Sequence, residues 1–415
     1  MAVQLPETVR TFVEENLVDR HGTNSEKWDG LQAEFGATDL LPLWIADMEF
    51  AAPQAVRDAL VARVTTGVYG YSFTPDSYYA ALADWMQRRH GVTIQSDWVR
   101  LTTGIVKALY MMVDWLTAPG APVAVMEPVY YPFMHAIEDQ GRKVVSANLQ
   151  WGESGWQIDF DELEQVLAVN HPRLLILCSP HNPVGRIWTA DELRRVLSIA
   201  EKHDVIVVAD EIHQDFEVGG PRFTSALAVA TPTQMRHLVV LNAASKTFNL
   251  AALNNGNVLI PDAHLRADYD QYSQRVDNVA GTMLGQIATE AGYRHGEEWF
   301  DHLLDVVRFN YDHLRDVLAD GAPQVKVADL QGTYLSFLDL GAYVDAQDIR
   351  DFVQNQAHLA VDYGEWFAPT TATCIRLNLA TDPQIVDEAA RRIVAASVVQ
   401  SRWHGHAVRI KSKHR

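Results

Sequence analysis

Residues 173–216 read RLLILCSPHNPVGRIWTADELRRVLSIAEKHDVIVVADEIHQDF. The stretch holds two short, almost wholly apolar runs, RLLILC and DVIVVA, on either side of the amphipathic segment TADELRRVLSIAEKH. Runs that are apolar on both faces predict buried strands of a parallel sheet, and the segment between them predicts a crossover helix with Thr189 as its N-cap. The stretch therefore indicates an α/β fold in which helices cover both faces of the sheet.

The flanking sequence continues this pattern. Similar apolar runs occur in APVAVME (121–127), RKVVSANL (142–149) and HLVVLNA (237–243). Helices are predicted where the apolar residues have helical spacing, over 53–64 with a proline in the first turn, over 77–91 ending at Gly91, and over 105–116. Residues 53–292 thus predict one large domain built on a mainly parallel sheet.

The alternation of short apolar runs and helical segments ends at about residue 293. A long amphipathic helix is predicted over 296–321, an antiparallel strand pair over 325–340, a strand over 374–380 and a closing helix over 383–399. These segments predict a smaller α+β domain over 293–400, which we expect the turn-rich residues 1–52 to join. Residues 401–415 are basic and aperiodic, and we expect a disordered tail there.

Charge and composition exclude several classes of function. The 415 residues include 34 Lys and Arg against 53 Asp and Glu, a net charge of −19, which argues against a nucleic acid or an anionic membrane as a partner. There are only two cysteines, no metal-ligand spacing, no leader-like start and no apolar run of about 18 residues. We expect a cytoplasmic protein without a metal site or a membrane span.

Chemically useful side chains follow the predicted strands. Asn182 comes after one strand, Asp210 ends the next and Lys246 follows a third, while Gly104 precedes a helix. Ligands of parallel sheets bind beyond the carboxyl ends of the strands, so these groups should meet at one edge. A lysine can form a Schiff base, a carboxylate can keep a pyridine nitrogen protonated, an amide can bind a phenolate, and a helix start can hold a phosphate. Together these are the requirements of pyridoxal 5'-phosphate.

The motifs around these residues resemble a known family. SPHNPVGRIW (179–188), VVADEIHQDF (207–216) and SKTFNLAAL (245–253) resemble the fold type I pyridoxal-phosphate enzymes of the class I/II aminotransferase superfamily. GTNSEKWD (22–29), LPLWIADMEF (41–50), YGY (69–71) and PVYYPF (128–133) are similar to its cystathionine β-lyase-like C–S lyase branch. With GTYLSFLDL (332–340) and IRLNLA (375–380), the resemblance runs from about residue 20 to about residue 395.

The resemblance implies a role for each matching residue. Lys246 would bond to the cofactor and later move the substrate's Cα proton, and Asp210 would pair with the pyridine nitrogen. Arg376 would clamp the substrate carboxylate, although an ion pair within the core is the alternative for this arginine. The remaining implied contacts are Gly104, Ile105, Val106 and Ser245 at the phosphate, Asn182 and His213 at the phenolate oxygen, Tyr130 and Ile212 on the two ring faces, and Tyr71 at the phosphate of a neighbouring subunit.

Three positions depart from the family's pattern. Ala244 stands where a hydroxyl residue is common, two residues before the lysine. Asn254 stands where many transaminases carry an arginine, which slightly favours the lyase branch. The segment DYGEWFAPTTATC (362–374) lacks the glycine-rich run expected in a lyase. Because this segment should border the substrate pocket, it bears on which substrate is bound.

The resemblance implies a homodimeric C–S β-lyase with shared active sites. It would cleave an S-substituted L-cysteine, cystathionine or a related conjugate, to a thiol, pyruvate and ammonia. An aminotransferase is the first alternative. A second is a biosynthetic enzyme for a bulky S-cysteinyl conjugate, acting by β-elimination or by decarboxylation-coupled oxidative deamination, as in lincosamide antibiotic assembly. A third is a regulatory binding protein that keeps the fold without turnover.

Overall fold

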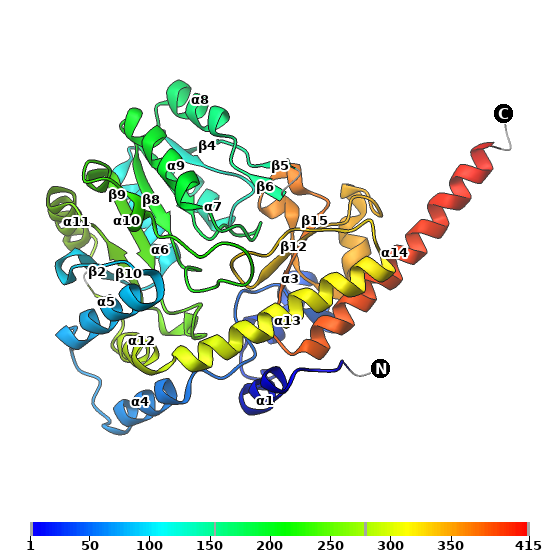
Figure 1. Cartoon of the computed structure of the whole chain (residues 1–415), viewed down its shortest axis with the longest axis horizontal. Coiled ribbons are helices and arrows are strands. Elements are labelled where there is room, and N and C mark those ends of the chain that lie inside the picture. The colour runs from blue at the N-terminus through cyan, green and yellow to red at the C-terminus, as the bar shows by residue number, and fades with distance from the viewer. Residues whose placement is uncertain (1–2, 153–154, 278–279, 413–415) are drawn as a thin grey trace.

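The computed structural model describes residues 3–152, 155–277 and 280–412, with side chains described up to residue 400. Its larger sheet has the strand order β2-β10-β9-β8-β7-β3-β4 (Figure 1). β10 is antiparallel to both of its neighbours, and the pairs from β9 to β4 are all parallel. The strands are β2 (Val99–Thr102), β3 (Pro122–Val125), β4 (Lys143–Ser146), β7 (Leu174–Cys178), β8 (Ile206–Asp210), β9 (Leu238–Asn242) and β10 (Gly256–Leu259). The predicted α/β fold with a mainly parallel sheet is confirmed.

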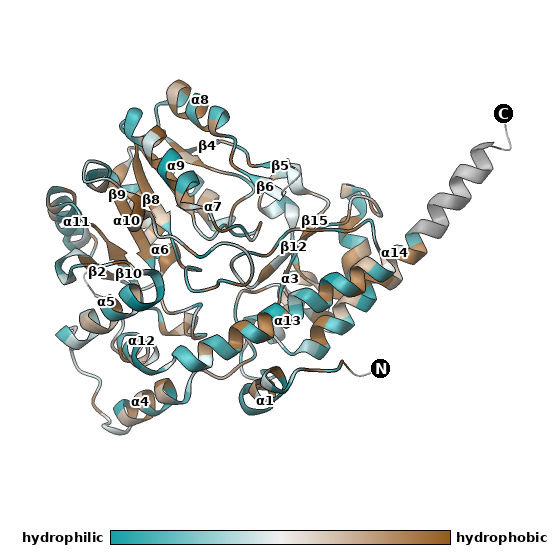
Figure 2. Ribbon diagram, viewed as in Figure 1, coloured by the Kyte–Doolittle hydropathy of each residue, from teal (hydrophilic) through white to brown (hydrophobic). Residues whose placement is uncertain are grey.

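Helices flank this sheet, as the sequence predicts. β7, β8 and β9 are buried throughout and form the apolar centre of the layer (Figure 2). The crossover helix begins at the predicted cap, where the Thr189 hydroxyl accepts from the Glu192 amide and the Glu192 carboxylate accepts from the Thr189 amide. The helices of this part are α4 (Gln54–Thr65), α5 (Asp76–His90), α6 (Ile105–Leu116), α7 (Pro132–Glu138), α8 (Phe160–Asn170), α9 (Ala190–Lys202), α10 (Ala226–Val229), α11 (Ala263–Arg275) and α12 (Met283–His295).

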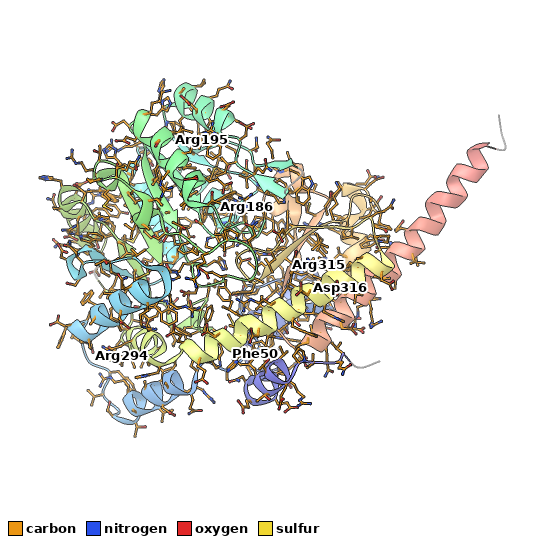
Figure 3. The ribbon with its side chains drawn as sticks, viewed as in Figure 1. Phe50, Arg186, Arg195, Arg294, Arg315 and Asp316 are labelled. Carbon is orange, nitrogen blue, oxygen red and sulfur yellow. The ribbon has the colours of Figure 1, made fainter. Side chains whose placement is uncertain are left out.

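The smaller part is an antiparallel sheet covered by two long helices. Its strand order is β11-β12-β15-β14, and α13 packs against α14 (Figure 1). On the outward face of α13, Arg315 and Asp316 are exposed (Figure 3). The elements are α13 (Glu297–Gly321), β11 (Lys326–Val327), β12 (Leu335–Asp339), β14 (Asp362–Tyr363), β15 (Cys374–Asn378) and α14 (Pro383–Ser412).

The N-terminal residues pack against this smaller part. β1 (Leu41–Pro42) pairs with β13 (Leu359–Ala360), and the Asn378 amide of β15 donates to the Leu43 carbonyl. Phe50, labelled in Figure 3, contacts Phe12 of α1 (Glu7–Asn16), with ring centroids 5.2 Å apart. Phe12 in turn contacts Trp299 of α13. Two short helices, α2 (Glu26–Asp29) and α3 (Leu31–Phe35), complete the N-terminal segment.

Several elements were not predicted. The sequence pattern did not predict β2, β10 or the hairpin of β5 (Gln150–Gly152) and β6 (Gly155–Gln157). Helix α14 continues to Ser412, so the backbone of 401–412 is helical where we expected a disordered tail. No proline interrupts that segment, and a helix already stabilised upstream extends readily. Residues 413–415 lie outside the described residues. Within the described ranges, no helix is both long and apolar enough to cross a membrane.

Candidate active site

A cavity of about 350 Å³ lies where β7, β8 and β9 end and α6 begins. Polar side chains from all three strand ends face it, as expected for an open parallel sheet. Its lining includes the predicted residues Gly104, Ile105, Val106, Tyr130, Asn182, Asp210, Ile212, His213, Ser245 and Lys246. The structure therefore brings these residues together around one space, while their individual roles remain predictions.

Lys246 lies in the loop after β9 and reaches the cavity with its amine. The Nζ atom donates a hydrogen bond of 2.6 Å to the Ala46 carbonyl, which also accepts from the Tyr334 hydroxyl. The pKa of Lys246 is lowered to about 8, chiefly by burial and also by Arg376, while Asp47 and Asp210 act in the opposite direction. The amine is thus closer to its neutral, nucleophilic form near neutral pH than an ordinary lysine.

Asp210, at the end of β8, is a buried carboxylate whose charge interacts with Lys246 without forming an ion pair. Its Oδ1 accepts from the Ile212 amide at 3.1 Å, and no ion pair to it occurs among the described residues. Burial raises its pKa to about 7. A buried carboxylate in this state is stabilised by a cationic group in the cavity, so the site fits a protonated ring nitrogen.

Asn182 has its orientation fixed by Arg376. Its Oδ1 accepts from the Arg376 Nη1 at 2.9 Å, which leaves the NH₂ group of the amide as a donor toward the cavity. That orientation fits the predicted bond to a phenolate oxygen. Arg376 lies behind Asn182 and is itself ion-paired with Asp362. Asn182 therefore stands between the Arg376 guanidinium and the cavity.

The start of α6 provides an anion site. Gly104, with φ of +145°, is the N-cap, and no side chain caps the helix. The first amides of a helix have no intrahelical partner, so those of Ile105 and Val106 are available to a phosphate. Thr103, Lys107, Asn254 and Asn255 also line this cavity, although the sequence analysis gave them no role here. Lys107 brings a positive charge, as the arginine absent at Asn254 would have done.

His213, Tyr130 and Ile212 complete the lining. The Nδ1 atom of His213 is buried without a partner among the described residues, and burial keeps the pKa of this imidazole well below its usual value. A neutral histidine can donate to or accept from a ligand oxygen. Tyr130 and Ile212 present an aromatic ring and an aliphatic chain, the two kinds of surface on which a flat heterocycle packs.

Tyr71 does not reach this cavity in its own chain. It is fully exposed and lies in the loop between α4 and α5, beside a separate pocket with Arg63 and Met283. Arg376 also lies outside the residues that line the cavity directly, one layer behind Asn182. Of the predicted site residues, ten line the cavity, Arg376 lies behind it and Tyr71 is exposed on the surface.

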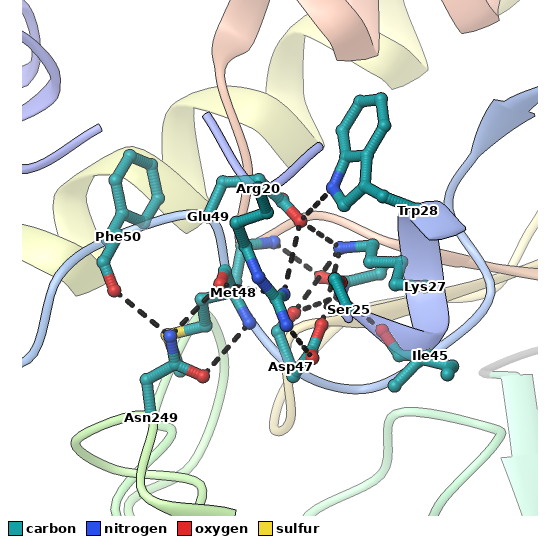
Figure 4. A network of polar contacts seen from close by, with 12 residues as sticks. Arg20, Ser25, Lys27, Trp28, Ile45, Asp47, Met48, Glu49, Phe50 and Asn249 are labelled. Carbon is teal, nitrogen blue, oxygen red and sulfur yellow. Dashed lines mark hydrogen bonds and ion pairs between the residues drawn. The ribbon is translucent and has the colours of Figure 1, made fainter. Parts of the chain in front are cut away.

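A buried polar network joins the N-terminal segment to Asn249, in the loop that carries Lys246 (Figure 4). The Lys27 Nζ lies 2.8 Å from a Glu49 oxygen, and Arg20 lies 2.7 Å from Asp47. Asn249 lies three residues after Lys246. Its Oδ1 accepts from the Met48 amide, and its Nδ2 donates to the Met48 carbonyl. The network fixes the 45–50 backbone, including the carbonyl that accepts from Lys246. The block LPLWIADMEF (41–50) was predicted to be a family motif, but its contact with Lys246 and Asn249 was not predicted.

Replacing Lys27 by methionine should destabilise the protein strongly. Lys27 has no exposed side-chain surface, and its loss leaves the buried Glu49 carboxylate with only the more distant Arg20, 3.7 Å away, as a cation. Breaking a buried ion pair from one side costs about 3–5 kcal/mol. Lys202→Met is the matched control, because the Lys202–Glu164 pair is exposed and such pairs contribute about 1 kcal/mol or less. Urea unfolding measures both, and equal losses in the two variants would contradict the account of this network.

Comparison with known proteins agrees with this geometry. The family model "Aminotransferase class I and II" matches residues 38–393. Cystathionine beta-lyase PatB of Bacillus subtilis is 34% identical to the chain over 91% of the chain and 98% of its own length. Protein MalY of Escherichia coli is 32% identical, over 87% of the chain and 93% of its own length.

Solved structures give the same result. Cystalysin of Treponema denticola, which contains a pyridoxal 5'-phosphate cofactor, has a TM-score of 0.87 and 31% identity, and the match covers 91% of this chain and 97% of that chain.

A second solved structure, the pyridoxal-phosphate-bound C–S lyase of Staphylococcus hominis, has a TM-score of 0.86 and 26% identity, and covers 96% of this chain and 99% of that chain. The family model spans most of the chain, and two curated relatives exceed 30% identity over nearly their whole lengths. The family predicted from the sequence motifs is therefore confirmed. The chain belongs to the class I and II aminotransferase family.

Proposed function

We propose that the chain is a pyridoxal-phosphate-dependent C–S β-lyase. It would cleave an S-substituted L-cysteine, cystathionine or a related conjugate, to a thiol, pyruvate and ammonia. The observation that carries the proposal is the convergence of Lys246, Asp210 and Asn182 on one cavity at the strand ends. The names of the relatives, cystathionine beta-lyase and C–S lyase, support this choice of reaction within the family.

The cavity fits the cofactor on its own chemistry. Asp210 is a buried carboxylate that needs a cation, the start of α6 needs an anion, and Asn182 offers a donor between them. When bound, pyridoxal phosphate supplies an aldehyde that combines with amines and a ring that accepts electron density from the substrate. Each group of the cofactor thus meets a complementary group of the protein.

Each of these residues would have a separate role in the reaction. Asp210 would hold the proton on the ring nitrogen, and Asn182 would donate to the phenolate oxygen. Lys246 removes the Cα proton of the substrate once its amine is free, and a pKa of about 8 suits a general base near neutral pH. Arg376, behind Asn182, orients the substrate through its carboxylate. The thiolate leaves from the β-carbon, and the remaining fragment hydrolyses to pyruvate and ammonia.

We also propose that two copies of the chain share their active sites. Val61, Val64, Val68, Tyr69 and Phe73 are exposed on α4 and the loop after it, together with Tyr71. Exposed apolar residues gathered in this way are typical of protein interfaces. A second copy on this face would bring its Tyr71 to the phosphate end of the cavity.

Both cysteines are free and buried, which is consistent with the reducing conditions of the cytoplasm.

The reaction is tested by following thiol and pyruvate together. The purified protein, loaded with pyridoxal phosphate, is mixed with L-cystathionine or with a bulky S-substituted cysteine, and no keto acid is added. We expect thiol and pyruvate to be released in equal amounts, because β-elimination yields one of each. The better of the two substrates separates a general from a specialised role.

Three results would contradict the β-lyase. Turnover that begins only when a keto acid is added, with no thiol released, would identify an aminotransferase. Release of carbon dioxide in place of pyruvate would indicate the decarboxylating reaction. A protein that binds the cofactor and turns over none of these substrates would favour the regulatory alternative.

A further inference from the structure

Asp362 and Arg376 form a buried ion pair beside the active site. They lie opposite each other on the antiparallel strands β14 and β15, so their side chains share one face of the small sheet. Both side chains are only 2% exposed, and the Asp362 Oδ2 accepts from the Arg376 Nη2. Asp362 belongs to the segment 362–374, which departs from the family's pattern.

The guanidinium of Arg376 already has several partners. Nη1 donates to Asn182 at 2.9 Å, and Nη2 donates to the Trp44 carbonyl at 3.2 Å as well as to Asp362. The ring of Phe367 lies 5.0 Å from the guanidinium carbon. Nε is buried without a partner among the described residues. A substrate carboxylate that binds Arg376 therefore meets an arginine whose charge a protein carboxylate already offsets.

We propose that Asp362 is a specificity-determining residue that competes with the substrate's α-carboxylate for Arg376. This inference rests on the proposed function. Two carboxylates and one guanidinium in a buried space carry a net negative charge, which is costly without a further proton. The α-carboxylate consequently binds together with a proton from solvent, which neutralises Asp362. The site then favours amino acids over the corresponding amines less than an unpaired arginine would.

The surroundings of Asp362 support proton uptake. Burial raises its pKa to about 6, and Glu34 of α3 acts in the same direction, while Arg376 lowers it. Tyr130 and Tyr131 also lie near this carboxylate, and burial, together with the charge of Asp362, raises the pKa of both phenols. The phenols stay neutral near pH 7, so Glu34 and Arg376 are the charged groups that face Asp362. A substrate carboxylate would raise the pKa further, so binding should strengthen as the pH falls.

The test compares two ligands that differ only in the α-carboxylate. L-Methionine and 3-(methylthio)propylamine both lack a leaving group on the β-carbon. Their binding to the cofactor-loaded enzyme is followed by the change in its absorption spectrum, which requires no turnover. For Asp362→Asn, we expect the affinity for L-methionine to rise about tenfold, the effect of removing one nearby charge, and the affinity for the amine to stay within about twofold.

The pH dependence supplies a second measurement that needs no variant. As the pH falls from 8 to 6, the wild-type affinity for L-methionine should rise relative to the affinity for the amine. Both ligands share the titration of Lys246 and of the ligand amine, so these cancel in the ratio of affinities. The ratio should be flat in Asp362→Asn. Glu365→Gln is the control, since it removes a nearby charge that pairs with Arg350 at the surface.

Three outcomes would overturn the proposal: an unchanged ratio of affinities in Asp362→Asn, a flat wild-type ratio between pH 6 and pH 8, or no binding of either ligand. These results are separate from the failure of the proposed function. An aminotransferase would release no thiol from cystathionine, yet its ratio of amino-acid to amine affinity would still report on Asp362.

Discussion

Lys246→Ala is expected to abolish turnover and the yellow colour of the cofactor-loaded protein. The Lys246 amine donates to the Ala46 carbonyl at the cavity, and in the proposed mechanism it both holds the cofactor and moves the Cα proton. Loss of a general base alone slows a reaction by about 10²–10⁴-fold, and loss of the covalent link adds to this. Steady-state rates and the absorption spectrum measure the two effects.

A surface lysine provides the control for this variant. Lys143→Ala removes an exposed lysine from β4, at a distance from the cavity lining, and should leave both readouts unchanged. A Lys246→Ala protein that keeps its turnover would show that another group moves the proton. A variant that keeps its yellow colour would show that the cofactor is bonded elsewhere.

Asp210→Asn is expected to have the second largest effect. The amide keeps the size of the side chain but removes the buried charge that would hold a proton on the ring nitrogen. Removing one preorganised electrostatic group from an active site costs about 10²–10³-fold in kcat. Turnover should fall by that amount, while the cofactor stays bonded to Lys246 and the protein stays yellow.

Asp204→Asn is the matched control, because Asp204 lies just before the other end of β8 and is exposed. It should leave kcat unchanged. An Asp210→Asn protein with wild-type kcat would show that the ring nitrogen needs no carboxylate in this reaction. Both proteins should unfold at similar denaturant concentrations to the wild type when the cofactor is bound.

The parallel part of the fold could be predicted because its strands are apolar on both faces. β7, β8 and β9 each form one unbroken apolar run, and α9 between two of them has a full capping box. β2 and β10 were missed because their short runs contain polar residues, such as Asn257 and Arg100, that the sheet accommodates through specific partners. Such pairing depends on tertiary contacts that periodicity does not express.

The part of the site that lies at the ends of the parallel strands could also be predicted from the sequence. Lys246, Asp210 and Asn182 follow buried strands directly, so their convergence is a consequence of the parallel sheet. The pairing of Asp362 with Arg376 depends instead on the register of β14 against β15, 14 residues apart in the chain. The position of Ala46 depends on the network around Lys27 and Glu49, which joins separate segments.

Chemical mapping of the cofactor tests the central claim most directly. The cofactor-loaded protein is reduced with borohydride, which fixes the cofactor to the amine that holds it, and the digested peptides are analysed by mass spectrometry. The account predicts one modified peptide, with the added mass on Lys246. A modification on a different lysine, or none on any peptide, would contradict it.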